Sequence, residues 1–163
     1  MYCLSFLWRK RKVETARCDI LVVSSCGGHL KQILDLKPSY SQHTVYFAIN
    51  DKYSVPEELK ESAFRIVHAE RNLLQIVHFF EALAILLIAR PKILLSAGAA
   101  PIVIFCLIGK LFGTKTIFIE SFSRLTSPSL TGKIMYRLAD IFYYQWETLN
   151  EFFPKGKFEG SIL

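Results

Sequence analysis

Short apolar runs alternate along the chain with segments of helical periodicity, and this alternation restricts the possible folds more than any other feature. Five runs rich in β-branched residues are predicted as strands: 20–23, 44–48, 64–67, 92–95 and 116–119. Helices are predicted between them: 29–36, 73–89, 101–112 and 130–138. Several strands are apolar at successive positions, as strands covered on both faces are. The pattern predicts an α/β fold, a Rossmann-like doubly wound parallel sheet.

The composition is basic and apolar at once, and this narrows the expected partners. The chain has 163 residues, a net charge of +6 and 52% hydrophobic residues. This length suits a single domain. A nucleic-acid-binding protein usually carries its basic residues on a polar surface, so no nucleic-acid partner is expected. A basic and apolar chain suits an anionic membrane surface instead.

Residues 1–18 form a separate amino-terminal segment in this interpretation, and 19–163 form the domain. The basic residues 9–12 follow the apolar run MYCLSFLW, which either rests on lipid headgroups or belongs to a frayed basic tail. A spanning helix needs roughly 20 apolar residues, so no transmembrane anchor is expected here. Residues 73–89 and 93–109 are predicted as protein core, although 85–88 can bury one face in a partner or a bilayer surface.

Three turns that follow predicted strands are the candidate binding site. The turn after the first strand has the sequence SSCGGH, in which two glycines expose backbone N–H groups at the positive end of a helix. The second turn is SAGAAP and the third loop begins ESFSR. Parallel strands end at one edge of the sheet, so the three should converge and suit a diphosphate. The candidate diphosphate-binding residues are Ser25, Gly27, Gly28, Gly98, Ala99, Ala100 and Arg124.

Two titratable side chains in these turns are candidate catalytic residues. His29 is either a general base for a hydroxyl group or a positioning residue at the first helix. Glu120 either orients or deprotonates an acceptor hydroxyl or pairs with Arg124, whose guanidinium either clamps phosphate oxygens or forms a surface ion pair. The four cysteines have no metal-ligand spacing. Neither a metal ion nor another cofactor is expected.

Three segments together resemble a known family: SSCGGHLKQIL, LLSAGAAPIVIFCLIGKLFGTKTIFIESFSR and SPSLTGKIMYRLADIFYYQWE. They look like the acceptor-side subunit of a split oligosaccharide glycosyltransferase. Its members include the membrane-associated subunit of the N-acetylglucosaminyltransferase of asparagine-linked glycosylation, and bacterial capsule and exopolysaccharide proteins. A more distant relative is the amino-terminal half of the lipid-II-forming N-acetylglucosaminyltransferase.

The resemblance implies half of a GT-B glycosyltransferase, in which the other half holds the nucleotide sugar. By motif, Gly27, Gly28 and His29 match the acceptor loop, and 98–101 match the second loop. Glu120 matches the acidic residue that closes the fifth strand, and KFEGSIL matches the strand before the interdomain linker. The chain departs from the eukaryotic subunit in lacking an amino-terminal spanning helix, which favours a bacterial protein held peripherally at the cytoplasmic face of the plasma membrane.

The expected function is therefore that of a glycosyltransferase subunit in polysaccharide synthesis. It would bind a polyprenyl-diphosphate-linked sugar and recruit a small donor-binding subunit for inverting transfer. Two alternatives stay open: a non-catalytic membrane recruiter of a competent partner, and a complete small nucleotide-binding enzyme.

Overall fold

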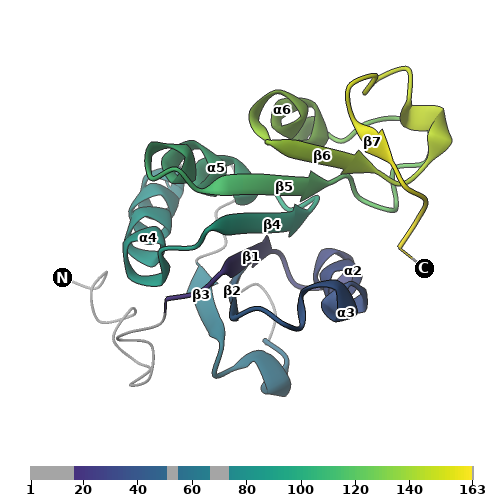
Figure 1. Ribbon diagram of the computed structural model, residues 1–163. Coiled ribbons are helices and arrows are strands. Elements are labelled where there is room, and N and C mark those ends of the chain that lie inside the picture. The colour runs from purple at the N-terminus through teal and green to yellow at the C-terminus, as the bar shows by residue number, and fades with distance from the viewer. Residues whose placement is uncertain (1–16, 51–54, 67–73, 163) are drawn as a thin grey trace.

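The computed structural model describes residues 17–50, 55–66 and 74–162, and the predicted doubly wound sheet is confirmed in them (Figure 1). All neighbouring strands are parallel, in the order β3-β2-β1-β4-β5-β6-β7. The strands are β1 Ile20–Ser24, β2 Val45–Asn50, β3 Ala63–Ile66, β4 Ile93–Ala97, β5 Lys115–Ile119, β6 Ile141–Tyr144 and β7 Lys157–Phe158. The α-helices are α2 Gly28–Asp35, α3 Lys37–Tyr40, α4 Leu74–Ala89, α5 Ile102–Leu111 and α6 Leu130–Leu138. Two 3-10 turns, η1 Glu57–Leu59 and η2 Glu147–Leu149, complete the elements.

Strand β1 lies at the centre of the sheet, and all five of its residues are buried. Its side chains alternate between the two faces, so that Leu21 enters one core and Val22 the other. Leu21 lies beside Tyr46 of β2 and Leu94 of β4. A strand buried on both faces reads as a continuous apolar run, which is why this strand was visible in the sequence.

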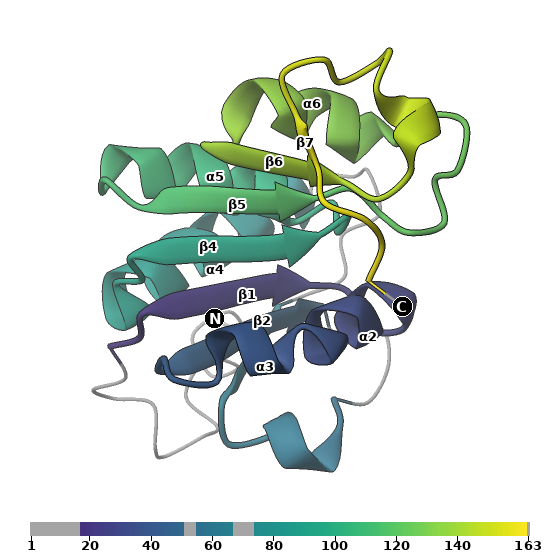
Figure 2. The ribbon, with the colours of Figure 1, turned by 45° about the vertical axis from the view of Figure 1, so that its right-hand side comes forward.

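Helices cover the two faces of the sheet unequally (Figure 2). Ile85 of α4, Phe105 of α5 and Met135 of α6 pack into the core on one face. Ile33 of α2 and Tyr40 of α3 pack into the core on the other face. Helix α2 packs against β1 and β4 on this second face, and the second face of β5 and β6 has no helix over it in the part of the chain that the structure describes.

The structure adds two strands to the five that apolar periodicity predicted. Strand β6 has only four residues, IFYY, and begins two residues after α6, and it is not among the strands predicted from apolar periodicity because the run is so short. Strand β7 has two exposed residues and was expected only from the family resemblance. Positions 1–16 of the amino-terminal segment, for which a membrane contact is predicted, lie outside the described residues. None of the helices in the described ranges has the length and apolar character needed to cross a bilayer.

Aromatic side chains bind the carboxyl-terminal strands to α6. Phe118 of β5 is fully buried and stacks on Phe142 of β6, with ring centroids 5.4 Å apart. Phe142 also contacts Phe153 at 4.6 Å and Tyr136 of α6 at 5.3 Å. These contacts place β6 beside β5, so the loop between these strands starts and ends at fixed positions.

We expect Phe118→Ala to lower the free energy of unfolding by about 3–5 kcal/mol, because it leaves a cavity at the centre of this cluster. Phe152→Ala removes an exposed ring and should cost less than about 1 kcal/mol. Urea denaturation of the two variants measures the difference. Equal losses would show that the cluster does not support the sheet.

Candidate functional site

The three predicted turns meet at the carboxyl edge of the sheet. Gly98, which follows β4, has φ +91°, and a Cβ atom built there would lie 2.8 Å from Cε1 of His29 and 3.0 Å from Cβ of Ser121. His29 belongs to the turn after β1, and Ser121 belongs to the loop after β5. The imidazole therefore packs directly on the backbone of the second turn, and only glycine fits at position 98.

The start of α2 is uncovered. Gly27 is the N-cap residue, with φ +94°, and no side chain caps the helix. A Cβ atom built at Gly27 or Gly28 would meet no heavy atom within 4 Å. The first N–H groups of a helix carry partial positive charge and have no partner within the helix. This turn can therefore accept an anion.

The second turn contributes its own backbone groups beside α2. The N–H groups of Ile102 and Val103 donate to the carbonyl groups of Ala99 and Ala100, both at 3.3 Å. The first amides of α5 are thus engaged within the turn. Ala100 is exposed and Ala99 is buried, so Ala100 is the more accessible of the two.

His29 is the titratable side chain at the centre of the site. Burial lowers the pKa of His29, while the Ala97 carbonyl and the Glu120 carboxyl raise it and Arg124 adds to the lowering. Nδ1 is buried and reaches hydrogen-bonding geometry with no group in the described residues. A neutral imidazole at pH 7 is the form that can accept a proton.

Glu120 is fully buried, and its carboxyl group is occupied by contacts within its own loop. The N–H group of Ser121 donates to Oε1 at 2.8 Å. Ser129 donates from its N–H group to Oε2 at 3.2 Å and from its hydroxyl group to both oxygens at 2.9 and 3.1 Å. Arg124, the pairing alternative from the sequence, is not among these partners. The placement favours a structural role in which Glu120 ties the end of β5 to the start of α6.

Ser129 links the Glu120 carboxyl group to α6. It is the N-cap residue of the helix, and its hydroxyl oxygen accepts the N–H group of Gly132 at 2.8 Å. A Cβ atom built at Gly132 would lie 1.7 Å from Oε2 of Glu120. The close approach of helix and carboxyl group therefore requires glycine at position 132.

The remaining predicted residues lie around this centre at different depths. Ser25 is half-buried, and Gly27, Gly28 and Arg124 are exposed. The Arg124 guanidinium is near enough to His29 to act on its pKa, so it adds positive charge to the mouth of the site. The structure therefore brings the three predicted turns together, as the parallel sheet requires.

Gln32 and Gln145 join α2 to the loop after β5 by hydrogen bonds. Neither residue was predicted from the sequence. Oε1 of Gln32 on α2 accepts the N–H group of Phe122 at 3.1 Å and the side-chain amide of Gln145 at 2.9 Å. The amide of Gln145 also donates to the carbonyl of Glu120 at 2.9 Å. Gln145 directly follows β6. A polar residue at the end of a parallel strand indicates a binding site, but β6 itself was not predicted from the sequence.

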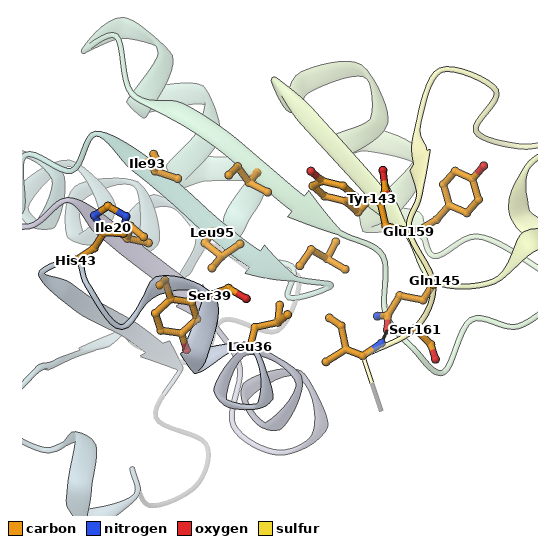
Figure 3. Close-up of a pocket in the computed structure, with 16 residues that line it drawn as sticks. Ile20, Leu36, Ser39, His43, Ile93, Leu95, Tyr143, Gln145, Glu159 and Ser161 are labelled. Carbon is orange, nitrogen blue, oxygen red and sulfur yellow. Dashed lines mark hydrogen bonds between the residues drawn. The ribbon is translucent and has the colours of Figure 1, made fainter.

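An apolar groove of about 540 Å³ lies on the second face of the sheet (Figure 3). Leu36 and Tyr40 line one side, Leu95 and Ile119 form the floor, and the segment 159–162 forms the other side. The N–H group of Ile162 donates to Oε1 of Gln145 at 2.9 Å. The wall of the groove is thus joined through one side chain to the loop that carries Glu120.

A family model described as "Oligosaccharide biosynthesis protein Alg14 like" matches residues 70–162, more than half of the chain. The chain belongs to this Alg14-like family. The resemblance seen in the sequence is thereby confirmed.

Several relatives of this Alg14-like chain carry the name "UDP-N-acetylglucosamine transferase subunit ALG14". The human protein is 25% identical over 182 residues, covering 89% of this chain and 83% of the human protein. The mouse protein is 27% identical over 179 residues, covering 88% and 82%. A shorter match to the rat protein is 35% identical over 80 residues and spans only 37% of that protein.

Two solved structures share the fold of this Alg14-like chain. MurG from Acinetobacter baumannii superposes with a TM-score of 0.63 at 13% identity, over 77% of this chain and 40% of that chain. UDP-GlcNAc 2-epimerase from Methanocaldococcus jannaschii gives a TM-score of 0.59 at 9% identity, over 81% and 40%. At these identities the likeness concerns the fold alone, and it confirms the predicted GT-B type of Rossmann-like domain.

We expect Gly132→Ala to lower the free energy of unfolding by about 1–3 kcal/mol, because the added methyl group overlaps the buried Glu120 carboxyl. Gly28→Ala is the matched control, since open space surrounds that position, and it should leave stability unchanged or slightly raised. Thermal denaturation compares the two. A stable Gly132→Ala protein would contradict the tight contact.

We expect the pKa of His29 to lie below 6.5 when it is measured by NMR titration of the imidazole signals, with His29→Gln identifying the resonance. The folded protein then binds this proton less readily than the unfolded chain. The His29 contribution therefore lowers the free energy of unfolding as the pH falls through about 6.5. Denaturation of both proteins between pH 5 and 7.5 should show a smaller loss for His29→Gln. A measured pKa above 6.5 would contradict the burial.

Proposed function

We propose that the chain is a glycosyltransferase subunit that binds a polyprenyl-diphosphate-linked sugar and acts together with a separate donor-binding subunit. The observation that carries this proposal is the close approach of His29 and Ser121 to Gly98, because it brings three turns together at one glycine. The names of the human and mouse relatives, which describe subunits of a UDP-N-acetylglucosamine transferase, support the same class of reaction.

The diphosphate of the acceptor binds at the uncovered start of α2 in this proposal. Gly27 and Gly28 allow close approach to the backbone, and the helix end supplies partial positive charge. The amides of the second turn face the same edge, and Arg124 supplies a guanidinium that matches phosphate oxygens. The lipid-linked sugar then extends from the diphosphate toward His29.

His29 is the proposed general base. A hydroxyl oxygen of the acceptor sugar attacks the anomeric carbon of the nucleotide sugar and forms the new glycosidic bond with inversion. The bond from that carbon to the diphosphate breaks, and the nucleoside diphosphate leaves with the electron pair. The hydroxyl proton passes to the imidazole. The partner subunit stabilises the charge that develops on the leaving group.

Glu120 is proposed as a positioning residue for this base. Its oxygens are engaged by Ser121 and Ser129, so they are not turned toward an acceptor hydroxyl. Its negative charge favours the protonated form of His29, which is the form that appears when the base accepts a proton. A buried carboxyl group that stabilises an imidazolium in this way supports general-base catalysis.

The groove on the second face of the sheet is the proposed contact for the donor-binding subunit. Parallel sheets normally have both faces covered, whereas Ile93 and Ile117 in this groove are only half-buried. The contact from Ile162 through Gln145 to the Glu120 carbonyl joins this groove to the site. A subunit docked in the groove therefore contacts a segment that is hydrogen-bonded to the loop of Glu120 and Ser121.

The proposal includes a peripheral position at the cytoplasmic face of the plasma membrane and a role in capsule or exopolysaccharide synthesis. The motif resemblance to bacterial proteins supports both. The sugar, the linkage and the nucleotide depend on the donor-binding subunit.

The test is sugar transfer to a polyprenyl-diphosphate-linked acceptor by the chain purified together with its donor-binding partner. We expect His29→Gln to lower turnover by about 10²–10⁴-fold, as loss of a general base does, while the pair still co-purifies. Asp35→Asn changes an exposed residue at the other end of the same helix and should keep full turnover.

Two outcomes would overturn the proposal. Full turnover by His29→Gln would indicate that the chain only recruits a partner that catalyses the reaction by itself. Tight calorimetric binding of a nucleotide sugar to the purified chain alone would indicate a complete small enzyme instead.

A further inference from the structure

Helix α4 exposes large apolar side chains, although its histidine and its glutamate are buried. His78 and Glu81 are only 8% and 7% exposed, whereas Phe80 is 61% exposed and Ile76 is 59% exposed. A helix on the surface of a water-soluble domain normally has the opposite arrangement. The outward face of α4 is therefore built for an apolar environment.

The exposed apolar residues of α4 follow helical spacing and continue onto α5. Phe79 and Phe80 lie side by side with ring centroids 5.7 Å apart. A hollow lined by Leu87 of α4 and by Phe112, which directly follows α5, joins the two helices. Together they form what we call the α4–α5 surface: Ile76, Phe79, Phe80, Leu87, Ile88, Leu107, Leu111 and Phe112. Leu111, at 84% exposed, is the most accessible of them.

The exposed charged side chains of α4 and α5, and of the residue that follows α4, are basic. Arg90 and Lys110 are exposed at the ends of α4 and α5, and Arg90 lines the hollow with Leu87 and Phe112. Glu81 is the one acidic residue in the sequences of α4 and α5, and it is buried. An apolar surface bordered by cations is complementary to an anionic lipid bilayer, where aromatic side chains and basic groups both favour the interface.

We propose that the α4–α5 surface docks on an anionic lipid bilayer. The inference deepens the proposed function and rests on it, because a lipid-linked acceptor needs its site beside a membrane. Both helices begin at the carboxyl edge of the sheet, where the three turns meet (Figure 1). A bilayer that runs along α4 and α5 therefore passes beside the diphosphate site.

The position of the surface leaves the proposed partner contact free. Helices α4 and α5 cover one face of the sheet, and the groove lies on the other face (Figure 2). One subunit can then contact the bilayer and the donor-binding subunit at the same time. An apolar surface of this extent is rare on a monomeric soluble protein and marks an interaction site.

The test is flotation of the full chain with phosphatidylcholine vesicles that contain or lack phosphatidylglycerol. We expect binding to the anionic vesicles and about tenfold weaker partitioning for each of Phe79→Ser and Phe80→Ser, because burial of an aromatic ring in an apolar environment is lost. Arg90→Gln and Lys110→Gln should each weaken binding to the anionic vesicles by about fivefold and leave the neutral vesicles unaffected. Phe152→Ser, which changes an exposed phenylalanine outside the surface, is the matched control and should bind as the wild type does.

Unchanged flotation of the Phe79→Ser/Phe80→Ser double variant would overturn the inference. So would loss of partner co-purification in that variant with flotation retained, because the surface would then be a protein interface. Transfer to a detergent-solubilised acceptor separates this inference from the proposed function. The double variant should keep that activity. If the wild-type pair transfers sugar but does not bind vesicles, the membrane-docking inference fails and the proposed function stands.

Discussion

The common direction of the seven strands is the constraint on which the rest of the structure depends. Because every neighbouring pair is parallel, the turn after each strand emerges at the same edge. The turns after β1, β4 and β5 therefore meet, and His29 and Ser121 both approach Gly98 closely. The position of the proposed diphosphate site therefore depends on the sheet topology more than on any single side chain.

Two carboxyl groups are buried among the described residues, whereas one helix exposes large apolar side chains. The Glu120 carboxyl is fully buried, held by Ser121 and Ser129, and used to fix the loop that borders the site. On α4 the buried residues include His78 and Glu81, while the phenylalanines point outward. Burying charge is tolerated where hydrogen bonds compensate for lost hydration, and exposing apolar residues is tolerated where another apolar phase covers them.

Strands that are buried on both faces were predictable from the sequence, and the short strand β6 was not. The run 20–23 is apolar at successive positions because both faces of β1 are covered. The run Ile141–Tyr144 has four residues, follows a helix closely and alternates between half-buried and buried positions. Missing β6 hid Gln145, because a polar residue signals a site only once the end of its strand is recognised.

The sequence by itself determined the fold class, the three turns and the candidates His29, Gly98 and Glu120, because strand periodicity and glycine-rich turns are local properties of the chain. The tertiary structure decided which partners these residues have. Ser129 rather than Arg124 holds Glu120, Gly132 admits the carboxyl group, and the large side chains of α4 face outward. Those choices depend on packing between segments distant in the sequence, and no local pattern records them.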